Sequence, residues 1–195
     1  MSARLVLLGA PGAGKGTQAA QLAKVLNVEA ISTGDIFRAN IKGETELGKL
    51  AQQYTAKGEL VPDSVTNAMV RDKLTSKVGD NPKDLGFILD GYPRNLAQVA
   101  ELDQILTDLG VTLDGAVEIT ADNAIVSERL LKRAEIEGRA DDTAEVIAHR
   151  LTVYAEQTAP ISGEYASRGA LVQVDGIGEV EEVTARLVAG IEQLG

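Results

Sequence analysis

The sequence contains no cysteine and no tryptophan, and its only histidine is His149. Without thiols the chain forms no disulfide, iron–sulfur cluster or cysteine-ligated zinc site. A single histidine cannot build a multi-histidine metal centre, and the amphipathic helical pattern around His149 favours a surface position. We therefore expect no structural zinc and no cysteine–histidine or serine–histidine catalytic pair.

Long apolar runs are also missing. The uninterrupted apolar core near the start covers only residues 5–8, whereas a secretory signal needs roughly 7–15 apolar residues and a membrane span about 18. The formal net charge of −10 would repel a nucleic acid. We expect a cytoplasmic protein that binds neither membranes nor nucleic acids.

Short apolar segments alternate with helix-like segments along the chain. The expected strands are 4–8, 28–32, 86–90, 115–119 and 170–174, and the expected helices are 15–26, 63–77, 95–109, 121–137, 142–158 and 178–194. This alternation predicts an α/β fold in which helices cover both faces of a parallel sheet. Two regions do not fit it, 33–62 and the polar segment 134–142, and we expect them to be insertions that form either mobile flaps or static surface loops.

A glycine-rich turn, "GAPGAGKGTQ" at 9–18, separates the first expected strand from the first expected helix. This is the context of a phosphate-binding loop, since glycines let backbone N–H groups point inward and the helix N-terminus attracts anions. Lys15 adds a mobile positive charge. In the common motif a serine or threonine follows the lysine, but here Gly16 intervenes before Thr17, so the pattern leaves direct contact of a hydroxyl with Mg²⁺ open. It predicts a polyphosphate ligand.

A second set of cationic residues follows the other strands. Arg38 comes after the second strand, Arg94 after the third, and Arg129, Arg133, Arg139 and Arg150 after the fourth. Loops at the carboxyl ends of parallel strands meet in one crevice, so Lys15, Arg38 and Arg94 should face a common cleft. Guanidinium groups bind phosphate and stabilise the charge of a transferring phosphoryl group. The set predicts phosphoryl transfer, although a surface ion pair is the simpler interpretation for any one arginine.

Six motifs occur in a characteristic order: "GAPGAGKGTQ", "STGD", "GELVPD", "GFILDGYPRN", "RLLKRAEIEGRADD" and "HRLTVY". Over essentially the whole chain they resemble the nucleoside monophosphate kinases, specifically the adenylate kinase family of the short-lid type, in which the late threonine is usual. The resemblance implies a monomer with a P-loop NTPase-like, five-stranded parallel sheet. It implies a core at 1–31, 63–132 and 144–195, an NMP-binding insertion at 32–62 and a short lid at 133–143.

The resemblance also implies roles for individual residues. The ATP side would comprise Gly12, Ala13, Gly14, Lys15, Gly16, Thr17, Arg129, Arg133 and Gly178. The AMP side would comprise Thr33, Arg38, Glu59, Leu60, Val61, Gly91, Tyr92, Pro93, Arg94, Gln98, Arg139 and Arg150. The catalytic cations would be Lys15, Arg94, Arg129, Arg133, Arg139 and Arg150, and Asp90 would order Mg²⁺ through water.

The expected reaction is the reversible, Mg²⁺-dependent transfer of the γ-phosphoryl group of ATP to AMP, giving two ADP, which serves adenine nucleotide homeostasis. Within the family, pyrimidine kinases tend to carry alanine and asparagine where this chain has Thr33 and Gln98. A glutamine amide can pair with adenine N1 and its amino group. The alternatives are a UMP/CMP kinase and a catalytically inactive nucleotide-binding regulatory module; a GTPase-like switch is disfavoured because no N-K-x-D-like guanine signal is present.

Overall fold

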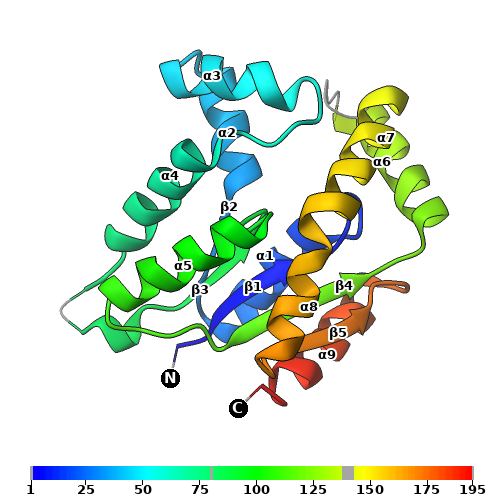
Figure 1. Ribbon diagram of the computed structural model, residues 1–195. Coiled ribbons are helices and arrows are strands. Elements are labelled where there is room, and N and C mark those ends of the chain that lie inside the picture. The colour runs from blue at the N-terminus through cyan, green and yellow to red at the C-terminus, as the bar shows by residue number, and fades with distance from the viewer. Residues whose placement is uncertain (1, 80, 138–142, 195) are drawn as a thin grey trace.

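Five parallel strands form a single sheet in the order β2-β3-β1-β4-β5 (Figure 1). The computed structural model describes residues 2–79, 81–137 and 143–194. The strands are β1 (Arg4–Leu8), β2 (Glu29–Ser32), β3 (Phe87–Asp90), β4 (Gly115–Thr120) and β5 (Leu171–Asp175). Every neighbouring pair is parallel, so the predicted α/β fold with a five-stranded parallel sheet is confirmed.

In the described part of the chain, a single helix follows β1, β3 and β5, and three helices follow β2 and β4. They are α1 (Lys15–Leu26), α2 (Thr33–Lys42), α3 (Glu46–Thr55), α4 (Asp63–Thr75), α5 (Leu96–Asp108), α6 (Asn123–Glu137), α7 (Ala144–Val153), α8 (Pro160–Ser167) and α9 (Val180–Ile191). A 3₁₀ turn, η1 (Pro82–Asp84), and a π-helical turn, η2 (Tyr154–Thr158), complete the described elements. None of the helices in the described part of the chain is both long enough and apolar enough to cross a membrane.

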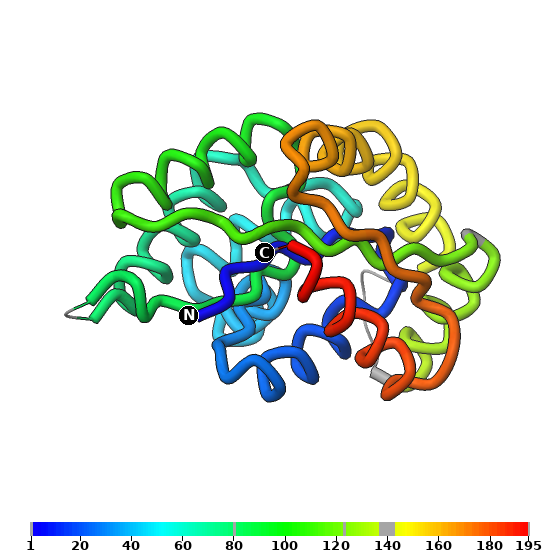
Figure 2. The backbone as a smooth tube through the Cα atoms, turned by 90° about the horizontal axis from the view of Figure 1, so that it is seen from below, coloured from blue at the N-terminus to red at the C-terminus, as the bar shows by residue number. Residues whose placement is uncertain are grey.

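Helices cover both faces of the sheet. Seen along the sheet, α1 and α9 lie on one side and α5 and α8 on the other (Figure 2). Alternate residues of β3 therefore enter different cores: Phe87 and Leu89 pack with Leu102 of α5, and Ile88 packs with Leu22 of α1. Burial on both faces explains why the inner strands are apolar at successive positions.

The helix expected at 142–158 is present, but its last turn is π-helical and a further helix after it was missed. α7 ends at Val153, the π-helical turn runs to Thr158, and α8 begins at Pro160. The amide N of Ala159 donates to the carbonyl O of Tyr154 at 2.8 Å. A hydrogen bond between residues i and i+5 is the pattern of a π-helix. Proline is tolerated in the first turn of a helix, where its missing N–H is not needed, so Pro160 starts α8.

The predicted NMP-binding insertion contains α2 and α3, which stand above the carboxyl end of the sheet (Figure 1). The two helices approach closely at Gly48, where a Cβ atom would lie 2.1 Å from the carbonyl O of Asn40. Phe37, Ala51 and Val61 form a small separate core there. The predicted short lid at 133–143 includes residues 138–142, which lie outside the described residues. The division into core, insertion and lid stays a prediction.

Candidate functional site

The glycine-rich loop between β1 and α1 has the backbone that its sequence predicts. Gly9, Gly12 and Gly14 have φ angles of +140°, +85° and +99°, a region that favours glycine. Gly14 caps the N-terminus of α1 in the left-handed conformation. At Gly12 a Cβ atom would lie 2.8 Å from Cγ of Leu130, so the loop packs directly against α6. The loop thus presents the free N–H groups of the first turn of α1 at the carboxyl edge of the sheet.

Lys15 folds back over this loop. Its Nζ donates to the carbonyl O of Gly9 at 2.8 Å and of Ala10 at 3.0 Å. The pKa of the Lys15 amine is lowered from 10.5 to about 8, chiefly by burial; the carboxylate of Asp90 opposes this fall, and nearby arginines add to it. Since cations crowd the amine, a polyanion bound beside it would be favourable.

Two cavities open along the carboxyl edge of the sheet. The first has a volume of about 410 Å³ and extends beneath α2 and α3, and the second, of about 650 Å³, extends along the glycine-rich loop towards α6. Each lies in the usual range for small-ligand sites. Both are lined by the same residues where they meet: Pro11, Lys15, Gly34, Arg38, Gly91, Arg94 and Arg150. We call these residues the shared wall. Four of them are cationic.

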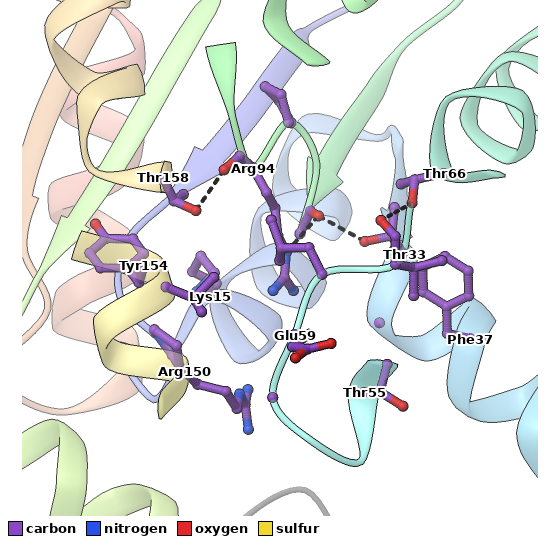
Figure 3. A pocket seen from close by; sticks show the side chains of 18 of the residues that line it. Lys15, Thr33, Phe37, Thr55, Glu59, Thr66, Arg94, Arg150, Tyr154 and Thr158 are labelled. Atoms are coloured by element: carbon purple, nitrogen blue, oxygen red, sulfur yellow. Dashed lines mark hydrogen bonds between the residues drawn. The ribbon is translucent and has the colours of Figure 1, made fainter. Parts of the chain in front are cut away.

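Arg94 lies in the middle of the shared wall, between Lys15 and Thr33 (Figure 3). Its Nε donates to the carbonyl O of Gly91 at 2.9 Å, and its carbonyl O accepts from Oγ1 of Thr158 at 2.7 Å. Arg94 and Arg150 both lower the pKa of Lys15, which shows that the three charges lie within electrostatic reach of one another. The structure therefore brings together the cations that sequence analysis expected in one cleft.

The 650 Å³ cavity contains the residues expected on the ATP side. It is lined by Gly12, Ala13, Gly14, Lys15, Gly16, Thr17, Arg129, Arg133 and Gly178, and also by Asp90. Nη2 of Arg129 donates to the carbonyl O of Gly176 at 3.3 Å. The side chain of Ala13 is buried in the core, so this residue offers the cavity only its backbone.

Asp90 is placed to serve a cation beside the loop. A Cβ atom at Gly16 would lie 3.7 Å from Oδ2 of Asp90, so the carboxylate lies alongside the start of α1. In residues 2–79, 81–137 and 143–194, no cluster of three or more acidic or histidine side chains could hold a metal ion by itself. One carboxylate near phosphate oxygens fits Mg²⁺, which keeps several waters and takes only one or two protein carboxylates.

The 410 Å³ cavity contains most residues expected on the AMP side. It is lined by Thr33, Arg38, Glu59, Leu60, Val61, Gly91, Pro93, Arg94, Gln98 and Arg150. Oγ1 of Thr33 donates to the carbonyl O of Gly91 at 2.9 Å. Arg38 forms an ion pair with Asp35 one helical turn earlier. Phe37 and Ile41 from α2 supply an apolar side to the cavity.

Two residues expected on the AMP side are not placed in this cavity. The side chain of Tyr92 lies in the main core with no exposed surface, and its hydroxyl donates to Oδ1 of Asn67 at 2.9 Å. Burial raises the pKa of Tyr92. Tyr92 can therefore reach a nucleotide only through its backbone. Arg139 lies outside the described residues.

Some residues of the cavity were missed by sequence analysis. Tyr154 and Thr158, both from the π turn, line the 410 Å³ cavity (Figure 3). Tyr154 closes the quoted motif "HRLTVY", which was the available signal, but Thr158 belongs to no motif. Gly58 has φ +77°, and a Cβ atom there would lie 2.9 Å from Cγ of Arg150. The predicted insertion therefore touches α7 across the cavity.

Comparison with known proteins agrees with this geometry. A family model described as "Adenylate kinase" matches residues 7–170. The chain is similar to the adenylate kinase of Kocuria rhizophila, with 57% identity over 97% of this chain and 99% of that protein. It is 53% identical to the adenylate kinase of Thermobifida fusca and 52% identical to that of Bifidobacterium longum, in both cases over 97% of this chain, and over 98% and 100% of those proteins. The chain belongs to the adenylate kinase family.

Proposed function

We propose that this protein is an adenylate kinase that reversibly transfers the γ-phosphoryl group of ATP to AMP, giving two ADP. The observation that carries the proposal is the shared wall, where Lys15, Arg38, Arg94 and Arg150 line both cavities at once. Two nucleotides with their phosphates against this wall would face each other. Four cations between them suit a reaction whose catalysis rests on positioning and electrostatics.

ATP would occupy the 650 Å³ cavity. The backbone N–H groups of Gly12–Thr17 would cradle its phosphates, and Lys15 would leave its carbonyl partners to follow the transferring group. Arg129 and Arg133 would neutralise the phosphates from α6. Gly178, with φ +127°, would let its backbone approach the adenine closely.

AMP would occupy the 410 Å³ cavity. Its phosphate would lie at the shared wall, bound by Arg38 and Arg94, and its base would lie towards Gln98 and Thr33. The backbone of 59–61 would contact the base from the other side. Phe37 and Ile41 supply the apolar surface that a purine needs.

In the transfer step, an oxygen of the AMP phosphate attacks the γ-phosphorus in line. The bond to the oxygen that bridges the β and γ phosphorus atoms breaks, and that oxygen keeps the electron pair as part of the departing ADP. Arg94 and Arg150, together with Arg139, would stabilise the charge that spreads over the moving group. No protein nucleophile is required, so an intermediate bonded to the chain is not expected.

Mg²⁺ would be held by phosphate oxygens and by water bound to Asp90, which lines the same cavity as Thr17. Bound there, it supplies charge neutralisation to the phosphates. Closing of the predicted insertion and lid would exclude water, which would otherwise accept the phosphoryl group.

We further propose that the enzyme works in the cytoplasm as a monomer and without nucleic acid or a membrane. Residues of one chain line both cavities. The net charge of −10 would oppose binding to nucleic acid or an anionic lipid surface.

The test is an acceptor panel. Purified protein is mixed with Mg²⁺ and ATP, and AMP, UMP, CMP or GMP is added separately, with diphosphates quantified by ion-exchange chromatography. Fast ADP formation with AMP alone supports the proposal. Comparable products from UMP or CMP would assign the protein to the pyrimidine kinases, and ATP binding without transfer would favour a regulatory module.

A further inference from the structure

Gln98 is almost completely buried, with 2% of its surface exposed, yet it lines the 410 Å³ cavity. Both ends of its amide are engaged within the protein. Its Oε1 accepts from the backbone N–H of Arg94 at 2.7 Å, and its Nε2 donates to Oδ1 of Asp63 at 2.7 Å. A glutamine amide has two N–H donors and two acceptor lone pairs. One N–H and one lone pair therefore remain for a ligand.

These two partners fix which end of the amide is which. A backbone N–H only donates and a carboxylate only accepts. If the amide turned over, its NH₂ group would face the N–H of Arg94, and its oxygen would face the carboxylate of Asp63. Both contacts would then be repulsive, and two buried hydrogen bonds would be lost.

Asp63 is itself held in place. It begins α4, and its two carboxylate oxygens lie 3.0 and 3.2 Å from Nδ2 of Asn95. Asn95 caps α5 by accepting from the backbone N of Gln98 at 2.8 Å. Asp63, Asn95 and Gln98 thus form a closed polar cluster between the starts of two helices. Asp63 lines neither cavity, so it acts on a ligand only through Gln98.

The amide orientation matters because two purines have opposite edges. Adenine has an amino donor at position 6 and an acceptor at N1, whereas hypoxanthine and guanine have an acceptor at O6 and a donor at N1. An amide in one orientation complements the adenine edge. The same amide turned over complements the hypoxanthine edge at the same place. Gln98 by itself therefore does not discriminate between 6-amino and 6-oxo purines.

We propose that Asp63 is a specificity-determining positioning residue, which locks the Gln98 amide so that the acceptor site takes a 6-amino purine monophosphate and rejects a 6-oxo purine monophosphate. The inference rests on the proposed function, because it concerns the base of the acceptor in the 410 Å³ cavity. An ordinary favourable charge at the N-terminus of α4 would explain Asp63 without Gln98. The two explanations differ in what they predict for selectivity.

The experiment compares kcat/KM for AMP and for inosine monophosphate, which has the 6-oxo edge without the bulk of the guanine amino group. In Asp63→Asn the new amide can donate to the oxygen of an inverted Gln98. The repulsion between that oxygen and the Asp63 carboxylate therefore disappears, and only the repulsion with the N–H of Arg94 remains. In Asp63→Ser, at the first residue of α4, the hydroxyl can donate or accept. We expect the preference for AMP to fall about tenfold or more in both variants. The matched control, Glu46→Gln, removes an exposed charge from the first turn of α3 and should leave the preference unchanged.

A double-mutant cycle separates positioning from stability. In a Gln98→Ala background there is no amide to orient, so Asp63→Asn should change the preference less than twofold. A lost helix charge would instead lower kcat/KM for both acceptors alike. An unchanged preference in both Asp63 variants, or an equal fall with and without Gln98, would overturn the inference. The proposed function is judged separately, on whether the unmodified enzyme phosphorylates AMP at all.

Discussion

Replacing Lys15 with methionine should stabilise the protein without nucleotide while destroying its activity. Methionine keeps the length of the side chain and removes its charge. In the folded protein the pKa of Lys15 falls from 10.5 to about 8, chiefly because the amine is buried. This fall corresponds to about 3 kcal/mol of unfavourable free energy for the protonated amine.

The loss of two hydrogen bonds reduces the stabilisation expected from removing the charge. The variant loses the hydrogen bonds from Nζ to the carbonyl oxygens of Gly9 and Ala10, each with a net value of about 0.5–1 kcal/mol. We therefore expect Lys15→Met to raise the free energy of unfolding at pH 7 by about 1–2 kcal/mol, which raises the melting temperature by about 2–8 °C in a protein of this size.

The pH dependence has a definite sign. Because the pKa of Lys15 is lower in the folded than in the unfolded protein, the unfolded state binds more protons between pH 8 and 10.5. The stability of the unmodified protein then rises with pH through that window. The advantage of Lys15→Met should be full below pH 8 and lost as the pH approaches 10.5.

The assay is thermal unfolding followed by circular dichroism at pH 7 and pH 10, without nucleotide. Lys24→Met, which removes an exposed lysine from the same helix, is the control and should melt like the unmodified protein. Adding Mg²⁺ and ATP should stabilise the unmodified protein and Lys24→Met but stabilise Lys15→Met far less. A Lys15→Met variant that melts at or below the unmodified protein at pH 7 would refute the reasoning.

Three further predictions concern the surroundings of the shared wall. Arg94→Ala should lower kcat about 10³-fold, because it removes a cation from the transferring group, with little change in melting temperature; normal turnover would contradict the assignment. Gly58→Ala places a side chain at φ +77° and 2.9 Å from Cγ of Arg150. It should lower the free energy of unfolding, measured with urea, by about 1–3 kcal/mol and raise KM for AMP. An unchanged KM would argue against contact between the insertion and α7. Glu118→Gln places an amide among three hydrogen-bond donors and should lower the free energy of unfolding by about 2 kcal/mol, whereas Glu156→Gln, at an exposed position, should not.

The sheet was predictable from sequence because its inner strands are covered on both faces. All five residues of β1 are buried, which produces an apolar run that alternation with helices places in a parallel sheet. The same reasoning failed at α8. Its first residue, Pro160, resembles the end of the preceding helix when only local pattern is considered, although it begins a new one.

The cationic residues of the site were predictable because the chemistry of phosphate restricts which residues suit it and where they lie. The residues that position the side chains of the site were not predictable. Thr158 bonds to the carbonyl O of Arg94 from 64 positions away, and Asp63 bonds to Gln98 from 35 positions away. Neither contact has a local pattern, since each depends on how helices pack on the sheet. Tyr92 lies within a predicted binding run, but in the segment after β3 its side chain packs into the main core.

The most direct test of the account supplies ADP and Mg²⁺ alone to the purified enzyme and follows the nucleotides by ³¹P NMR. If the two cavities hold two nucleotides with their phosphates against one cationic wall, ADP should be converted to equal amounts of ATP and AMP without release of inorganic phosphate. The reaction should approach the same equilibrium from ATP and AMP. ADP that stays unchanged, or that yields phosphate instead of ATP, would contradict the claim that the wall joins two nucleotide sites for transfer.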